Sequence, residues 1–121
     1  MTQHVMNITI AGQTWEVFTA DAHDPELIAD GHTCVGTTWC GHFKIFLSNE
    51  LQGSRLRRTI KHELTHAFIY STQCEVPETF NEEQICEFMA IYGEQIADWA
   101  HEIFGTVKNY CPSNCPTNCP K

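Results

Sequence analysis

The sequence is poor in basic residues. It has 7 Lys+Arg against 15 Asp+Glu, which gives 121 residues a formal net charge of −8. Non-specific binding to nucleic acid depends on Lys and Arg side chains that displace counterions from phosphates, and anionic lipid also attracts basic surfaces. An acidic chain is repelled by both. We therefore expect neither nucleic acid nor a membrane surface as a partner.

Long apolar runs are missing as well. No stretch approaches the roughly 18 apolar residues of a membrane span, and Met1 to Ile10 lacks the basic start and apolar region of an export signal. These absences predict a soluble, cytoplasmic protein. The cysteines number 7, which is odd, so we expect mostly reduced thiols rather than a disulfide framework. A chain this short forms one domain, and any active site in it must be compact.

Strand signals dominate the first half of the sequence. Residues 5–10 and 14–18 alternate apolar and polar side chains around a turn that contains Gly12, which predicts a β-hairpin. Residues 20–33 contain three Asp, one Pro and one Gly and predict a loop. Residues 34–39 and 42–47 flank Cys40-Gly41 and predict a second hairpin. Together they predict an antiparallel or mixed sheet of three to four strands.

Helical spacing begins near residue 50. Apolar residues then recur three and four apart and predict a helix to about residue 71; they are Leu56, Ile60, Leu64 and Ala67. A capping box of Thr79 and Glu82 predicts the start of a second helix, which Gly105 would end. This helix has a stripe of small residues, Cys86, Ala90, Gly93 and Ala97, which would let another helix approach. The fold class is thus α+β, with the sheet packed on two main helices.

The C-terminal segment is a short repeat of Cys-Pro-x-Asn. It contains Cys111, Cys115 and Cys119, and its three prolines exclude a helix. We interpret residues 1–107 as the single domain and residues 108–121 as a flexible tail whose partner is unknown. Three thiolates could bind zinc or copper, but their spacing matches no metal motif.

One pentapeptide, His62-Glu63-Leu64-Thr65-His66, carries the chemistry. Residues four apart lie on one face of a helix, so His62 and His66 can present two imidazole nitrogens to one metal ion. Glu63 lies beside them and can orient and deprotonate a water. Two nitrogen ligands, an open position and a carboxylate base are what a zinc hydrolase requires.

A third protein ligand must come from elsewhere. The second helix offers Glu82, Glu83 and Glu87, and we favour Glu83. Glu82 is engaged if the capping box forms, and Glu83 shares the small-residue face that we expect to meet the histidine helix. Glu87 could then support a ligand histidine through its second ring nitrogen.

Other residue types leave alternatives open. Cys34 or Cys40 would give the two-His-one-Cys set of peptide deformylases, but the acidic motif around that family's cysteine is absent. A donor is also needed for the oxyanion of the transition state. Tyr70, Tyr92 and His101 are candidates for this role.

The metal motif and its surroundings resemble a known group. Residues 59–68, followed by 80–88 and 90–93, look like the small phage and mobile-element zinc metallopeptidases related to the ImmA/IrrE family, and more broadly like the gluzincins. The resemblance covers roughly residues 5–105 and implies a minimal zincin-like fold. It also implies that His62, His66 and Glu83 bind Zn2+. A gluzincin has a small residue three positions after its ligand glutamate and an acid four after, as Cys86 and Glu87 are here.

The expected function is zinc-dependent hydrolysis of peptide bonds, with Glu63 as the general base and a peptide or protein as the substrate. The strand before the histidine helix, residues 42–47, would pair with an extended substrate. Two alternatives remain: a catalytically silent, zinc-stabilised phage interaction protein, and a zinc amidase or deformylase acting on a small substrate. The resemblance places the protein in a bacterial host cell, encoded by a phage or prophage.

Overall fold

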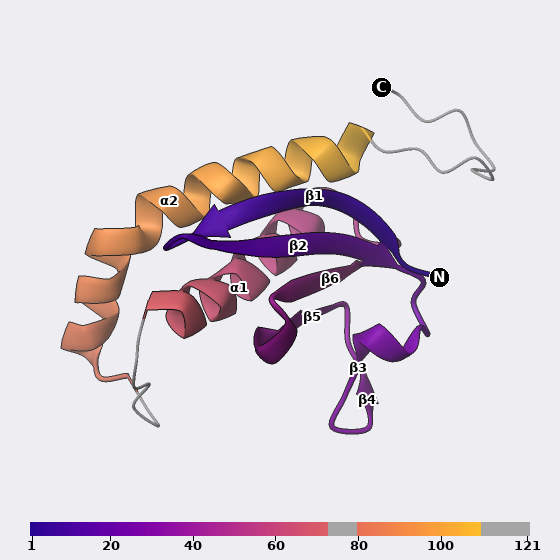
Figure 1. The fold of residues 1–121 in the computed structure, drawn as a ribbon, viewed down its shortest axis with the longest axis horizontal. Coiled ribbons are helices and arrows are strands. Elements are labelled where there is room, and N and C mark those ends of the chain that lie inside the picture. Colours follow the sequence, from indigo (N-terminus) through magenta and orange to yellow (C-terminus); the bar gives the residue numbers. More distant parts are fainter. Residues whose placement is uncertain (73–79, 110–121) are drawn as a thin grey trace.

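The computed structural model describes residues 1–72 and 80–109, and their fold is α+β, as the sequence predicts (Figure 1). In chain order the elements are β1 (Gln3–Ile10), β2 (Gln13–Ala20), the 3-10 helix η1 (Pro25–Leu27), β3 (Ile28–Ala29), β4 (His32–Thr33), β5 (Gly36–Trp39), the 3-10 helix η2 (Cys40–His42), β6 (Lys44–Ser48), α1 (Gly53–Thr72) and α2 (Glu82–Asn109). The C-terminal repeat lies outside the described residues.

The first predicted hairpin is confirmed. β1 and β2 pair antiparallel from Gln3 opposite Thr19 to Ile10 opposite Gln13. Ala11 and Gly12 connect them, both with positive φ (50° and 82°), which is the twist that a two-residue hairpin turn needs. The loop predicted over 20–33 is only partly irregular, because it contains η1 and the short β3–β4 hairpin.

The main sheet is mixed, with the strand order β1-β2-β6-β5. β5 and β6 form the second predicted hairpin, antiparallel from Gly36 opposite Leu47 to Trp39 opposite Lys44. β6 also pairs with β2 in parallel. β6 is therefore an interior strand, and β5 is an edge strand with a neighbour on one side only.

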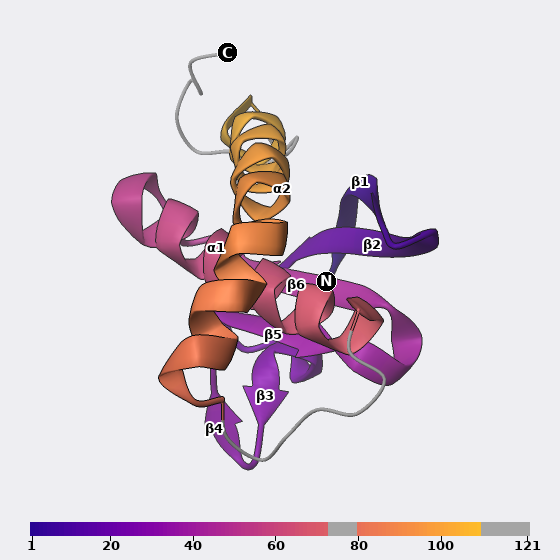
Figure 2. The same cartoon turned by 90° about the vertical axis from the view of Figure 1, so that its left-hand side faces the viewer.

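Both α-helices cover the same face of the sheet, as two perpendicular views show (Figures 1 and 2). α1 contacts β5, β6 and β1, whereas α2 contacts β1. The main core fills the space between these layers, with Ile8, Ile10, Trp15, Val17, Ile45 and Leu47 from the sheet, Leu56, Ile60, Leu64, Ala67 and Phe68 from α1, and Phe88, Ile96, Ala100 and Ile103 from α2. A smaller cluster of Ala20, Leu27 and Phe46 lies outside this core.

The ends of α2 differ from the prediction. Asn81 caps the helix: its side-chain Oδ1 accepts from the Gln84 backbone N–H at 2.8 Å, and its backbone N–H donates to Gln84 Oε1 at 2.9 Å. Asn81 and Gln84 thus form a capping box, because Asn caps as well as Thr and Gln serves as the reciprocal partner. Thr79, the predicted partner of Glu82 in a capping box, lies outside the described residues. Gly105 does not end the helix, which continues to Asn109 with Val107 packed against the core.

The first turns of α2 extend past the end of the β1–β2 hairpin (Figure 1). Three large apolar side chains here, Ile85, Met89 and Ile91, are about half exposed. None of the helices in residues 1–72 and 80–109 is long and apolar enough to cross a membrane.

Candidate metal and catalytic site

The pentapeptide lies in the middle of α1, as predicted. The rings of His62 and His66 have centroids 5.0 Å apart and are inclined at 72°. Both histidines are exposed, whereas Glu63 between them is only 6% exposed. Helical spacing thus sets two adjacent imidazoles at the surface and turns the carboxylate inward.

The edge strand β5 holds the Glu63 carboxylate. The Thr38 hydroxyl donates to Glu63 Oε1 at 2.7 Å, and the same hydroxyl lies 3.1 Å from the Glu63 backbone oxygen. This contact satisfies part of the hydrogen-bonding capacity of a buried carboxylate, which would otherwise be costly to desolvate. It also joins the centre of α1 to the free edge of the sheet.

Gly36 lets α1 approach β5 closely. A Cβ at this position would lie 2.7 Å from Thr59 Cγ2 and 3.1 Å from both Glu63 Cγ and Glu63 Oε2. Real Cβ atoms do not approach a carbon at 2.7 Å, so any larger residue would force the side chains of Thr59 and Glu63, or α1 itself, to shift. The absence of a side chain here therefore helps to position Glu63.

We expect the Gly36→Ala substitution to destabilise the fold by about 1–3 kcal/mol, because it overpacks the contact between β5 and α1. Urea unfolding measures this loss. Gly41→Ala is the matched control, since a Cβ at Gly41 meets nothing within 4 Å. Equal stabilities of the two variants would contradict this account of Gly36.

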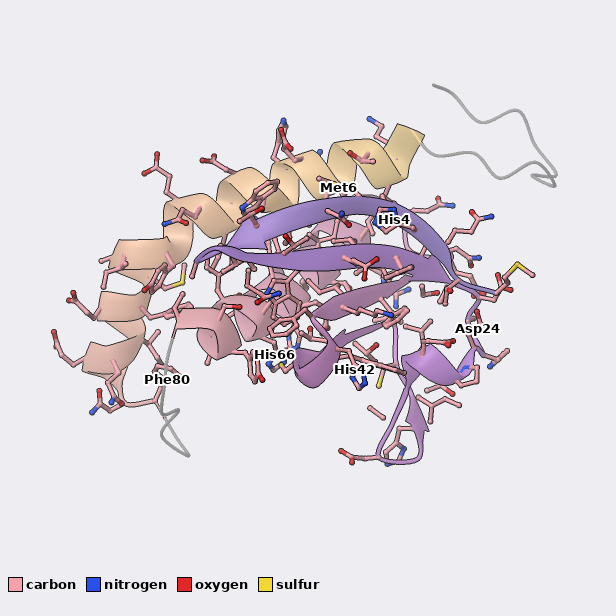
Figure 3. The ribbon with its side chains drawn as sticks, viewed as in Figure 1. His4, Met6, Asp24, His42, His66 and Phe80 are labelled. Atoms are coloured by element: carbon pink, nitrogen blue, oxygen red, sulfur yellow. The ribbon has the colours of Figure 1, made fainter. Side chains whose placement is uncertain are left out.

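Of the described thiols, Cys40 is the one whose pKa is affected by Glu63. It is half-buried at the start of η2, which contacts α1, and burial together with the negative charge of Glu63 raises the pKa of its thiol. Figure 3 shows His42, also on η2, and His66 on α1. Of the two thiols considered as a third ligand, Cys40 is the one close enough to Glu63 to interact with its charge. Cys34 instead donates to the His32 carbonyl at 3.7 Å.

The acids of α2 are not gathered with the histidines. α2 packs on the flank of α1 that carries Lys61 and Phe68, where the Phe68 and Tyr92 rings are 6.0 Å apart. At about 100° per residue, His62 and His66 lie about 100–140° around α1 from Lys61. Within the described part of the chain, no three His, Cys, Asp or Glu side chains form a group that could hold a metal ion. The assignments of Glu83 and Glu87 stay predictions.

Both arguments that favoured Glu83 over its neighbours are wrong. Glu82 is not part of the capping box, which Asn81 and Gln84 form. Cys86 and Ala90, the small residues near Glu83, are exposed, whereas Phe88, Ile96 and Ile103 are the residues of α2 that pack into the core. Glu83 is itself exposed in the first turn of α2.

The candidate oxyanion donors lie on different sides of α1: Tyr70 belongs to α1 itself, and Tyr92 and His101 belong to α2, which covers another side of α1. Tyr70 lies one turn after His66, is 46% exposed and packs edge-on against Trp15 and Phe43. Tyr92 is half-buried beside Phe68 on the flank covered by α2. His101, an exposed residue of α2, lines the cleft between α1 and α2 on that same side. Tyr70 is therefore the candidate on the same side of α1 as His66.

The comparisons with known proteins give no relative. No protein-family model matches the chain, and neither a curated protein nor a solved structure matches it. The functional argument therefore rests on the residues and their geometry.

The sequence analysis missed two residues of the site, Gly36 and Thr38. A glycine inside a predicted strand is a sign that another segment approaches closely, and this signal could have identified Gly36. Thr38 gives no comparable signal. The expected substrate strand also needs correction, because residues 44–48 form the interior strand β6, and the free edge beside Glu63 belongs to β5.

Proposed function

We propose that this chain is a zinc-dependent metallopeptidase, in which His62 and His66 are two of the zinc ligands and Glu63 is the general base. One observation carries the proposal: on the same turn of α1 as two adjacent exposed imidazoles, a buried carboxylate is held by Thr38 of the edge strand β5. Surface histidines with no common role would not require a buried, hydrogen-bonded acid on the same turn of the helix.

Two of the proposed ligands, His62 and His66, have the donor type that zinc prefers. Zinc favours imidazole nitrogen, and an i, i+4 pair on a helix is a standard way to provide two such ligands. When bound, zinc supplies a Lewis acid that polarises a carbonyl and lowers the pKa of water. The third ligand is proposed to be Glu83, as the gluzincin resemblance implies, with Cys40 as the alternative that lies near Glu63.

The chain's own residues would perform the proton transfers. Glu63 takes a proton from the attacking water as the water oxygen adds to the peptide carbonyl carbon. The same carboxylic acid then gives that proton to the leaving amine nitrogen. Thr38 keeps the carboxylate in place through Oε1 during both steps. Tyr70 can donate to the developing oxyanion from the turn after His66.

The substrate would bind as an added strand. β5 has unpaired backbone groups along one side, and an extended peptide can pair with such an edge. Its scissile carbonyl would then lie beside the centre of α1. We propose a peptide or protein substrate on this basis. Because of the family resemblance, we also propose that the protein acts in the cytoplasm of a bacterium that carries the phage or prophage.

A catalytically silent, zinc-stabilised interaction protein is the second candidate. The hydrogen bond between Thr38 and Glu63 favours it, because this bond gives Glu63 a structural role that needs no turnover. A zinc amidase or deformylase is a third possibility, and the observation that supports it is the half-buried Cys40, whose thiol lies close enough to feel the charge of Glu63.

The test is hydrolysis of a fluorogenic peptide library by the full chain supplied with zinc. We expect cleavage that a chelator abolishes and added zinc restores. Cleavage of formyl-methionyl peptides at the formyl group alone would support the deformylase instead. Zinc binding without any turnover would support the silent interaction protein and contradict the proposed function.

A further inference from the structure

A second cleft lies between α1 and α2, away from the histidine pair. It encloses about 140 Å³, and its lining residues are Arg57, Lys61, Ala97, Ala100, His101 and Phe104. The first two come from the N-terminal half of α1 and the others from the C-terminal half of α2. Neither His62 nor His66 lines this cleft, so it is distinct from the proposed zinc site.

Positive charge is concentrated at this cleft in a chain that has little of it. Four of the chain's 7 Lys+Arg lie in α1 within the seven residues 55–61, and they are Arg55, Arg57, Arg58 and Lys61. No acidic side chain lines the cleft. In the described residues, the ion pairs within 4 Å are those of the Met1 amine with Asp21 and Asp24, so Arg57 and Lys61 have no carboxylate partner.

The cations of the cleft are unpaired, and one of them is held in place. The first turn of α1 contains no acidic residue, and Arg57 and Lys61 follow in its next two turns. The Arg57 guanidinium is also fixed in place, with its Cζ 4.2 Å from the centroid of the Phe104 ring. Lys108 Nζ lies 6.0 Å from the same centroid. A preorganised guanidinium beside an unpaired ammonium is a favourable anion site.

We propose that this cleft binds a small oxyanion of the phosphate class. The Arg57 guanidinium and the Lys61 ammonium would contact its oxygens, and the His101 imidazole would provide a further N–H donor. Three donors suit a dianion better than a single carboxylate. Ala97, Ala100 and Phe104 form the apolar walls. Because the whole chain has a charge of −8, the attraction is local and favours a small anion over a nucleic acid.

The experiment is a titration of the isotopically labelled full chain with inorganic phosphate, followed by two-dimensional NMR at constant ionic strength set with chloride. We expect saturable shifts at the amides of Ala97, Ala100 and His101. Acetate is titrated in parallel as a carboxylate ligand, and it should bind about tenfold more weakly because it carries one charge rather than two. Equal binding of acetate would overturn the assignment to phosphate.

Substitutions identify the contacts. Arg57→Gln and Lys61→Gln should each weaken phosphate binding about tenfold, the loss expected when one charge-assisted hydrogen bond is removed. Lys61→Gln keeps the contact of Arg57 with Phe104, so it tests the site without disturbing that packing. Arg58→Gln is the matched control, since it removes the same charge from the same helix outside the cleft. Shifts that do not saturate, or equal losses in the Lys61 and Arg58 variants, would overturn the proposal.

Discussion

Replacing Glu63 by Gln should lower kcat for peptide hydrolysis by about 10²–10⁴-fold, which is the contribution of a positioned general base. The variant should still fold, because the Gln side-chain oxygen can accept the hydrogen bond that Thr38 donates to Glu63 Oε1 at 2.7 Å. Zinc content should also be unchanged, since Glu63 is not one of the proposed ligands. Steady-state kinetics, urea unfolding and metal analysis measure these three properties.

The control for Glu63 is Glu50→Gln. Glu50 is exposed and precedes α1, so this substitution makes the same change of charge away from the site. We expect its kcat to match that of the unmodified chain. If kcat of the Glu63 variant stayed within a few-fold of the unmodified value, the general-base assignment would be wrong.

The Trp15→Ala substitution should destabilise the fold by about 3–5 kcal/mol, as expected when a large buried aromatic is removed and leaves a cavity. Trp15 is fully buried on β2, contacts Phe43 and Tyr70 edge-on, and donates from Nε1 to Ser71 Oγ at 2.9 Å. Because small domains are stable by only about 5–15 kcal/mol, this loss would leave the fold marginal. Urea unfolding followed by far-ultraviolet circular dichroism measures it.

Trp15→Phe separates packing from hydrogen bonding. It keeps an aromatic ring in the core and loses the donor to Ser71, which should cost about 1 kcal/mol plus a smaller packing term. A Trp15→Ala loss no larger than that of Trp15→Phe would mean that the ring contributes little to the core, contrary to the structure.

The local parts of this fold could be predicted from the sequence. Alternation around Ala11 and Gly12 predicts the β1–β2 hairpin, and the spacing of Leu56, Ile60 and Leu64 predicts α1, because each pattern is decided within a few residues. The parallel pairing of β2 with β6 could not be predicted. It joins segments separated by a long connection, and no residue in either strand specifies its register.

The residues at which α2 begins and ends could not be predicted reliably, because the sequence offers competing start and stop signals. Thr79 and Asn81 can both begin a capping box, and only the structure distinguishes Asn81 with Gln84 as the pair that forms. A glycine in a helix costs only about 1 kcal/mol. The packing of Phe104 and Val107 against the core can offset that cost at Gly105, and the helix continues.

In the candidate site, too, the sequence predicts the local features but not those that depend on tertiary packing. His62, Glu63 and His66 are related by one turn of helix, so the sequence is enough to place their side chains relative to one another. A third ligand depends on how α2 crosses α1, and that crossing is set by the burial of Phe88, Ile96 and the large residues beyond them. The contribution of Thr38 and Gly36 depends likewise on which strand lies beside α1.

The metal content of the purified full chain, made without an affinity histidine tag, tests the central claim most directly. We predict about one zinc per chain, the stoichiometry of a single catalytic site. His66→Ala should lose the zinc, and Glu63→Gln and the exposed-loop control His23→Ala should keep it. Glu83→Ala and Cys40→Ala, measured beside them, identify the third ligand. A chain that binds no zinc, or one that keeps its zinc in His66→Ala, would contradict the account.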